Sequence, residues 1–190
     1  MRCVPSAPYL RSQRIVTVIA EQLRRAIARG IKVVHYSIQG DHLHLLVEAA
    51  DATKLARGMQ WLFSRIAMEV NRVALRSGRL FRDRHFRQTL ESPTQVRRAL
   101  VYIVMNGRKH GAQQGRSLLP LYEWLDECST AGFIDKWHPA DQPTALALAR
   151  ARAGPCSPGA KPTTWLARTG WWQRGGGALR FGEMPALKLL

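Results

Sequence analysis

The sequence predicts an α+β fold built on an antiparallel sheet. Two apolar segments, residues 33–39 and 42–49, are rich in residues that favour strands, and Gly40-Asp41 between them is a typical two-residue hairpin turn. Segments with apolar residues at helical spacing precede and follow this pair. The expected order is helix, hairpin, helix, strand and helix, which is typical of helices packed on an antiparallel sheet.

Start and stop signals place the helices. The first is expected over residues 17–29, before Gly30, and the second over residues 53–76, before Gly78. A further strand is predicted over residues 84–90.

The next helix has the clearest start. Ser92, Pro93 and Gln95 supply a capping residue, a proline at the first helical position and a side chain that closes a capping box. We expect this helix to run to about Asn106, with Gly107 as its stop.

The composition changes after residue 111, so we expect a core over residues 1–111 and a C-terminal extension over residues 112–190. The extension is expected to be partly helical and partly irregular and is a candidate DNA-binding region. Its expected parts are two helical segments, a Pro/Gly-rich linker and a Trp/Arg-rich tail, at residues 118–128, 145–153, 154–162 and 165–180.

The charge balance points to a polyanionic partner. The chain has 29 Lys and Arg against 13 Asp and Glu, a net charge of +16, and such an imbalance favours nucleic acid. The sequence contains no long apolar run, so a membrane is not indicated as the partner. The three cysteines are too widely spaced to indicate a disulfide framework or a zinc knuckle, so a cytoplasmic, nucleoid-associated location is expected.

The hairpin divides into an apolar and a polar face, because alternate side chains of a strand share a face. A two-residue turn places Ser37 opposite His44. The apolar face is then Val34, Tyr36, Ile38, Leu43, Leu45 and Val47, and the polar face is His35, Ser37, Gln39, His42, His44 and Glu48. Two imidazoles at i and i+2 can reach one metal ion, although two ordinary half-buried histidines would give the same pattern.

Tyr102 and Asn106 lie four residues apart and therefore share a flank of their helix. A tyrosine hydroxyl is a poor nucleophile at neutral pH, because its pKa is about 10. A cation that polarises the target phosphate would compensate, and Asn106 can offer that cation an oxygen. Two imidazoles and an amide oxygen suit Mn²⁺ or Mg²⁺. A tyrosine that only packs on the helix shoulder fits the same spacing.

These segments resemble a known group of enzymes. Residues 40–48, Gly-Asp-His-Leu-His-Leu-Leu-Val-Glu, resemble the His-hydrophobic-His motif of HUH-type single-strand nucleases. Residues 102–110, Tyr-Ile-Val-Met-Asn-Gly-Arg-Lys-His, resemble the tyrosine helix of the single-tyrosine transposases. The similarity to REP-associated tyrosine transposases continues through residues 80–86 and weakly at 164–171, and the two motifs together are more specific than either alone.

The resemblance implies a ferredoxin-like core in which His42 and His44 bind a divalent metal, Mg²⁺ or Mn²⁺, with Asn106 as the third ligand. It implies that Tyr102 attacks a phosphodiester of single-stranded DNA, forming a 5′-phosphotyrosine and a free 3′-OH that can later reverse the linkage. Relatives recognise hairpins formed by short palindromic repeats. The resemblance also implies a full first strand, of which only residues 1–4 remain here, so we expect a truncated strand and an exposed sheet edge.

The second expected helix and the predicted site carry basic and aromatic residues that suit the binding of single-stranded nucleic acid. The candidates for nucleic-acid binding are Arg57, Trp61, Arg65, Arg72, Arg76, Arg82, Arg84 and Lys109. For any single arginine, a solvated helix face is the favoured interpretation.

Other functions compatible with the sequence are a catalytically inactive DNA or RNA hairpin-binding protein, a small RNA-processing protein and a metallohydrolase that uses His42, His44 and Glu48. The last would form no covalent protein–DNA species. A monomer and a homodimer are both compatible with the sequence.

Overall fold

The computed structural model describes residues 1–82, 86–113, 125–151, 156 and 158–183, with the backbone alone described for residues 107–113. The longer elements are α1 (Gln13–Arg25), β1 (Ile31–Ile38), β2 (Leu43–Ala49), α2 (Ala52–Val73), α3 (Pro93–Gln113) and α4 (Gln142–Ala151). Shorter helical turns are Ala26–Arg29, Ala131–Phe133, Leu166–Gly170 and α5 (Trp171–Gln173). The predicted α+β class with an antiparallel sheet is confirmed.

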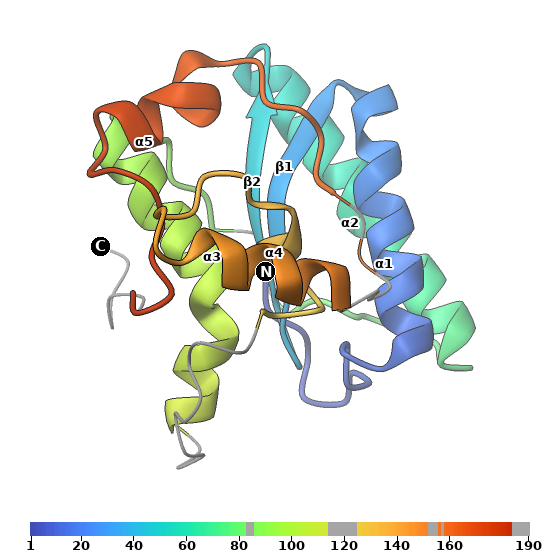
Figure 1. Ribbon diagram of the computed structural model, residues 1–190. Coiled ribbons are helices and arrows are strands. Elements are labelled where there is room, and N and C mark those ends of the chain that lie inside the picture. Colours follow the sequence, from blue (N-terminus) through green and yellow to red (C-terminus); the bar gives the residue numbers. More distant parts are fainter. Residues whose placement is uncertain (83–85, 114–124, 152–155, 157, 184–190) are drawn as a thin grey trace.

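The hairpin lies between two helical layers. Figure 1 shows α1 and α2 on one side of β1 and β2, with α3 on the other. The apolar face of the hairpin packs against α1 and α2, in a cluster that includes Ile19, Tyr36, Ile38, Leu62 and Ile66. The second cluster joins α3 to the C-terminal extension and includes Leu100, Val104, Trp137, Trp171 and Phe181.

The predicted hairpin register is confirmed near the turn, where Ser37 pairs with His44 and Ile38 with Leu43. Further along, the register shifts between Val33 and His35, so Val33 takes the core-facing position opposite Val47. The placement of Val34 on the apolar face by simple alternation was therefore wrong. A bulge inserts one residue into a strand, and two adjacent valines give no sign of which is inserted.

Residues 1–4 extend the hairpin beyond β2 through isolated bridges. Arg2 bridges to His42, and Cys3 bridges to Phe81 in the next segment. Backbone hydrogen bonds run from Leu43 N to the Met1 carbonyl at 3.0 Å and from Arg82 N to the Arg2 carbonyl at 2.9 Å. The short segment predicted to remain of a first strand thus lies beside the histidine strand.

The C-terminal extension covers the outer edge of β1. Ile38 N donates to the Cys128 carbonyl at 2.8 Å, and Ala160 N donates to the Val33 carbonyl at 2.8 Å. At Gly159, a Cβ atom would lie 1.7 Å from the Val34 carbonyl oxygen, so this close approach requires glycine. The unpaired backbone groups of an edge strand are thereby satisfied within the chain.

Helix α3 begins as predicted and ends later. Ser92 Oγ accepts from Gln95 N at 3.3 Å, and Gln95 Oε1 accepts from Ser92 N at 3.2 Å, which completes the capping box. The predicted stop at Gly107 was wrong, because α3 continues to Gln113. A glycine inside a helix costs only about 1 kcal/mol relative to alanine, so neighbouring turns can carry the helix through it.

Other boundaries also differ from the prediction. Helix α1 begins at Gln13, four residues before the expected start, and α2 ends at Val73, three residues before the expected end. Residues 86–90 of the predicted strand are irregular, while residues 84 and 85 lie outside the described part. Of the helix expected at 118–128, residues 118–124 also lie outside the described part, residues 125–126 are irregular, and residues 127–128 form a turn. Helix α4 begins at Gln142, three residues before the predicted start. In the described part of the chain, no helix is long and apolar enough to cross a membrane.

A buried ion pair joins the first helix region to the extension. Arg11 donates from both terminal nitrogens to the two carboxylate oxygens of Asp126, at 2.7 and 3.1 Å, and also to the Ile38 carbonyl at 2.9 Å. The Asp126 side chain is fully buried, and its carboxylate also accepts from Cys128 N at 3.0 Å.

Replacing Asp126 with alanine is expected to lower the free energy of unfolding by about 3 kcal/mol, because the Arg11 charge is left buried without its partner. Urea unfolding of the variant measures this loss. The double substitution Arg11→Met with Asp126→Leu should recover most of it, since an apolar pair leaves no charge behind. A single variant as stable as wild type would show that water replaces the carboxylate at no cost.

A second prediction concerns His35, whose Nδ1 lies 3.1 Å from Thr130 Oγ1. Burial lowers the pKa of His35 to about 4, against a small opposing effect of the Asp135 charge. In the unfolded chain the pKa of this residue is about 6.5. Between pH 4 and pH 6.5 the unfolded chain therefore binds a proton at His35 that the folded protein does not bind. The stability is therefore complete above pH 6.5 and falls as the pH is lowered towards 4.

Between pH 7 and pH 4.5, the free energy of unfolding should decrease by about 2 kcal/mol less in His35→Gln than in wild type. Urea unfolding of wild type and variant at pH 7 and pH 4.5 separates this effect from the titration of acidic residues, which both proteins share. An equal loss of stability in the two proteins would contradict the assignment.

Candidate active site

The two histidines stand together at the start of β2. Residues two apart in a strand share a face, and the ring centroids of His42 and His44 are 4.7 Å apart, with the rings nearly perpendicular. His42 is only 8% exposed. Leu46, on the same face, packs into the cluster that surrounds α3. The histidine face of the hairpin is therefore the face that α3 covers.

Asp41 fixes the orientation of His42. Its Oδ1 lies 2.6 Å from His42 Nδ1, so the ionised carboxylate accepts from Nδ1 and leaves Nε2 as the lone-pair nitrogen. Burial alone would raise the pKa of Asp41, but the hydrogen bond from His42 and the charge of Arg2 outweigh it and lower the pKa. Histidines that bind metals usually donate their other ring N–H in this way.

Tyr102 reaches the histidines from α3. Its ring centroid is 4.8 Å from that of His44, and the two rings are perpendicular. Burial raises the pKa of Tyr102, and the positive charge of Arg2 acts in the opposite direction. The phenol is therefore protonated at neutral pH, and its oxygen would need help to act as a nucleophile.

Asn106 lies one helical turn after Tyr102, on the same flank of α3. It is completely buried, yet neither its Nδ2 nor its Oδ1 has a hydrogen-bond partner among the described residues. Leaving a buried amide without partners costs roughly 1–3 kcal/mol for each group. Asn106 thus offers a donor and an acceptor that the described residues do not satisfy, which makes it a candidate ligand.

The donor types of these residues are compatible with the divalent metal that the resemblance implies. In the described part of the chain, no three His, Cys, Asp or Glu side chains come together as a metal-binding group. Asn106, one turn after Tyr102 on α3, carries an amide oxygen of the kind that such an ion could bind. Two imidazoles, one held by Asp41, and an amide oxygen form a nitrogen and oxygen set that suits Mn²⁺ or Mg²⁺ better than a thiolate-seeking metal.

Glu48 does not belong to this group. Its two carboxylate oxygens accept four hydrogen bonds from the backbone and hydroxyls of Thr163 and Thr164, at 2.5 to 3.0 Å. It also lies four residues from His44, which is about 13 Å along a strand. Glu48 anchors the extension to β2, and this geometry disfavours the metallohydrolase that would use it as a ligand.

The predicted DNA-binding residues of α2 are not gathered around Tyr102, because α2 lies on the other side of the hairpin. Arg65 and Arg72 both form ion pairs with Glu69, at 3.0 and 2.8 Å. Arg76 donates to Asn71 Oδ1 at 2.7 Å and to the Arg79 carbonyl at 3.2 Å.

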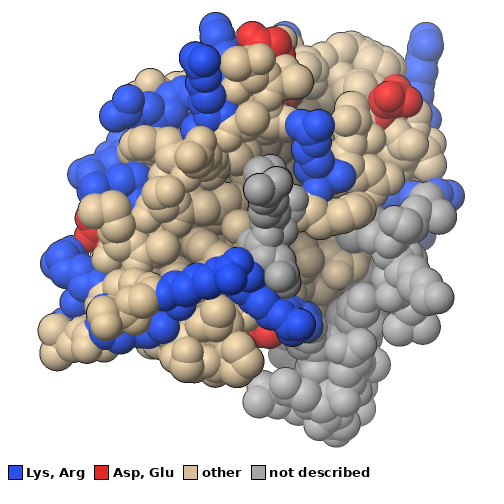
Figure 2. All heavy atoms as spheres, turned by 180° about the vertical axis from the view of Figure 1, so that it is seen from behind, with Lys and Arg blue, Asp and Glu red and all other residues tan. Residues whose placement is uncertain are grey.

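Trp61 is half-buried against the core, and the Arg29 guanidinium lies 5.1 Å from its ring centroid. Arg57 is exposed. Among the other candidates, Arg82 lies next to Arg2, whereas Arg84 and the side chain of Lys109 lie outside the described residues. Figure 2 shows basic side chains bordering a mostly uncharged area, with few acidic side chains between them.

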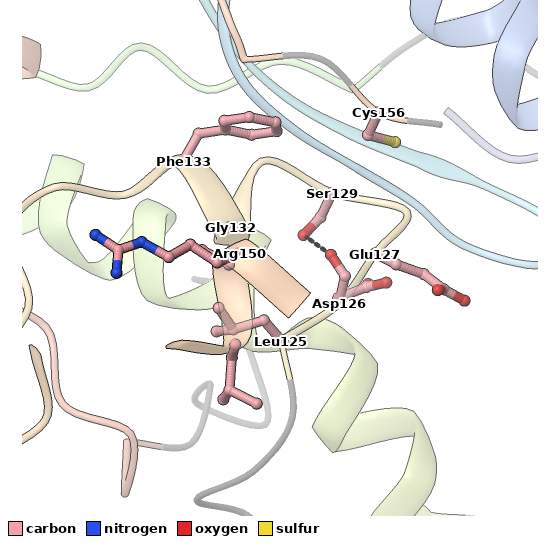
Figure 3. Close-up of a pocket in the computed structure, with 10 residues that line it drawn as sticks. Leu125, Asp126, Glu127, Ser129, Gly132, Phe133, Arg150 and Cys156 are labelled. Carbon is pink, nitrogen blue, oxygen red and sulfur yellow. Dashed lines mark hydrogen bonds between the residues drawn. The ribbon is translucent and has the colours of Figure 1, made fainter. Parts of the chain in front are cut away.

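A pocket of about 200 Å³ lies away from these residues, between the turn at residues 125–133 and α4 (Figure 3). Its lining includes Asp126, Glu127, Phe133 and Arg150, and Ser129 Oγ donates to the Asp126 carbonyl at 2.8 Å within it. None of the predicted site residues contributes to the pocket.

Two residues near the histidines were missed by the sequence interpretation. Asp41 was considered only as a turn residue, although a carboxylate directly before a His-x-His motif is a signal for a histidine-orienting group. Arg2 gave no local signal, because it reaches the histidines only through strand pairing.

Comparisons of the chain with protein-family models, with characterised proteins and with solved structures find no match.

Proposed function

We propose that this protein is a metal-dependent endonuclease and strand transferase that acts on single-stranded, hairpin-forming DNA through a covalent tyrosine intermediate. The observation that supports it best is the contact of Tyr102 with His44, which itself stands against His42. The resemblance had placed these three residues in one active site, although they come from segments about sixty residues apart.

We further infer that the fold is a reduced ferredoxin-like core. The bridges of residues 2 and 3 to His42 and Phe81 support this inference, because they continue the sheet antiparallel beyond β2. Helices α1 and α2 packed together on one face of the hairpin are also compatible with it.

In the proposed reaction, the Tyr102 hydroxyl oxygen attacks the phosphorus of a DNA phosphodiester. The bond from phosphorus to the 3′ oxygen breaks, and that oxygen keeps the electron pair and takes up a proton. The tyrosine proton passes to water. The products are a 5′-phosphotyrosine and a free 3′-OH, which can reverse the step without an external energy source.

His42, His44 and Asn106 would hold the metal, and Asp41 would keep the His42 ring in place. A bound Mg²⁺ or Mn²⁺ would supply positive charge to the oxygens of the target phosphate. The His44 ring and α3 hold Tyr102 in position, which would favour attack because less entropy must be lost in the reaction.

Covalent trapping tests this proposal. The protein is mixed with labelled single-stranded hairpin oligonucleotides from the flanks of its own gene, with Mn²⁺ or Mg²⁺, and resolved on a denaturing gel. A shifted band that EDTA removes is the expected result. Hairpin binding without any covalent band would instead favour a catalytically inactive binding protein, and preference for RNA with no effect of metal would favour an RNA-binding protein.

A further inference from the structure

Arg2 lies on the same sheet face as the two histidines. It bridges antiparallel to His42, and residues directly opposite each other in an antiparallel pair point to the same side, with Cβ atoms about 4.5–5.5 Å apart. The backbone hydrogen bonds of Met1 and Cys3 to Leu43 and Asp41 fix this register. The face that presents the histidines towards α3 therefore continues onto Arg2.

The next segment adds a second arginine to the same row. Cys3 bridges antiparallel to Phe81, which places Arg82 opposite Arg2, and Arg82 N donates to the Arg2 carbonyl at 2.9 Å. Cys3 and Phe81 are buried in the core on the other face. His42, Arg2 and Arg82 therefore follow one another across neighbouring chain segments.

The Arg2 guanidinium is available to a phosphate. Its Nε lies 3.5 Å from Asp41 Oδ2, and the side chains are 63% and 60% exposed. An exposed ion pair of this kind contributes little, so exchanging the carboxylate for a phosphate oxygen costs little free energy. A guanidinium can offer two parallel N–H groups to a phosphate. Arg2 also borders the histidine pair that Tyr102 contacts, because His42 lies opposite Arg2 and its ring stands against that of His44, on which Tyr102 packs.

We propose that Arg2 is a catalytic residue whose guanidinium donates to a non-bridging oxygen of the phosphate that Tyr102 attacks. This proposal rests on the proposed function. While the bond from Tyr102 Oη to phosphorus forms and the bond to the 3′ oxygen breaks, negative charge develops on the transferring phosphoryl group, and Arg2 stabilises that charge without giving up a proton. Preorganised donors at such positions contribute more to the transition state than to binding.

The test compares the rate of covalent adduct formation at saturating hairpin DNA and metal for wild type, Arg2→Ala and Arg2→Lys. Arg24→Ala is the matched control, because Arg24 is an exposed arginine paired with Glu21 on α1, which lies on the opposite side of the hairpin from α3. We expect Arg2→Ala to lower the rate about 100-fold, and to weaken hairpin binding less than about 5-fold. The rate of Arg2→Lys should lie between those of Arg2→Ala and wild type, because lysine keeps the positive charge but lacks the two parallel N–H groups of the guanidinium.

Guanidinium ion added below its denaturing range separates a chemical from a structural role. It should restore part of the Arg2→Ala rate and leave the rate of Arg24→Ala unchanged. Circular dichroism and urea unfolding confirm that each variant is folded. An Arg2→Ala rate within about 3-fold of wild type, or a slow variant that guanidinium does not rescue, overturns the role of Arg2 and leaves the tyrosine nuclease intact. A wild-type protein that forms no adduct overturns both.

Discussion

Tyr102→Phe is expected to abolish the covalent protein–DNA adduct, lowering its formation at least 1,000-fold, roughly the loss seen when a catalytic nucleophile is removed. The substitution deletes only the hydroxyl oxygen that would attack phosphorus and keeps the ring that contacts His44. Hairpin affinity should therefore stay within about 3-fold of wild type, and the free energy of unfolding within about 1 kcal/mol. Denaturing gels measure the adduct, and a gel-shift titration measures binding.

Tyr9→Phe is the matched control for this variant. Tyr9 is 65% exposed and lies against Gly40 in the hairpin turn, so it is a tyrosine near the histidine strand without a place in the proposed site. Full adduct formation by Tyr9→Phe, with none by Tyr102→Phe, is the expected pair of results. An adduct that persists in Tyr102→Phe would assign the chemistry to another residue.

Asn106→Leu is expected to stabilise the metal-free protein while removing its metal response. Leucine has a similar volume and carries no polar atoms, so the cost of a fully buried amide without partners among the described residues disappears. In EDTA, urea unfolding should show a gain of about 1–3 kcal/mol. The increase in Tm that Mn²⁺ gives wild type should require at least about 10-fold more metal in the variant, because one ligand is missing.

Gln22→Leu serves as the control for stability. Gln22 on α1 is also buried, and its Oε1 has no hydrogen-bond partner in the described residues. It packs away from α3, so this variant should gain stability and keep the metal response of wild type. A loss of stability in Asn106→Leu, or an unchanged Mn²⁺ response, would show that Asn106 serves the packing of α3 and not a metal.

The parts of the fold that could be predicted are those with a local cause. The hairpin turn at Gly40-Asp41 sets the pairing of Ser37 with His44, and this pairing alone assigns every nearby side chain to a face. The capping box of Ser92 and Gln95 likewise depends only on residues three apart. In both places the sequence is sufficient because the interacting groups are close neighbours in the chain.

The remaining features depend on contacts between distant segments. The bulge at Val34 accompanies the close approach of Gly159 to the Val34 carbonyl, and nothing near Val34 in the sequence indicates it. The extension was not expected to cover β1, because several of the contacts are backbone hydrogen bonds that any residue can make, such as those of Cys128 and Ala160. Arg2 acquires its place beside His42 only through strand pairing, so its relation to the site is invisible before the fold is known.

The measurement that tests the central claim most directly is the identity of the residue that carries DNA. The wild-type adduct formed with Mn²⁺ is digested with nuclease and protease, and the nucleotide-bearing peptide is sequenced by mass spectrometry. The proposal predicts a single modified residue, Tyr102, attached through a 5′-phosphate, together with an unblocked 3′-OH on the released strand. A nucleotide on any other residue, or a 3′-phosphate linkage, would contradict it.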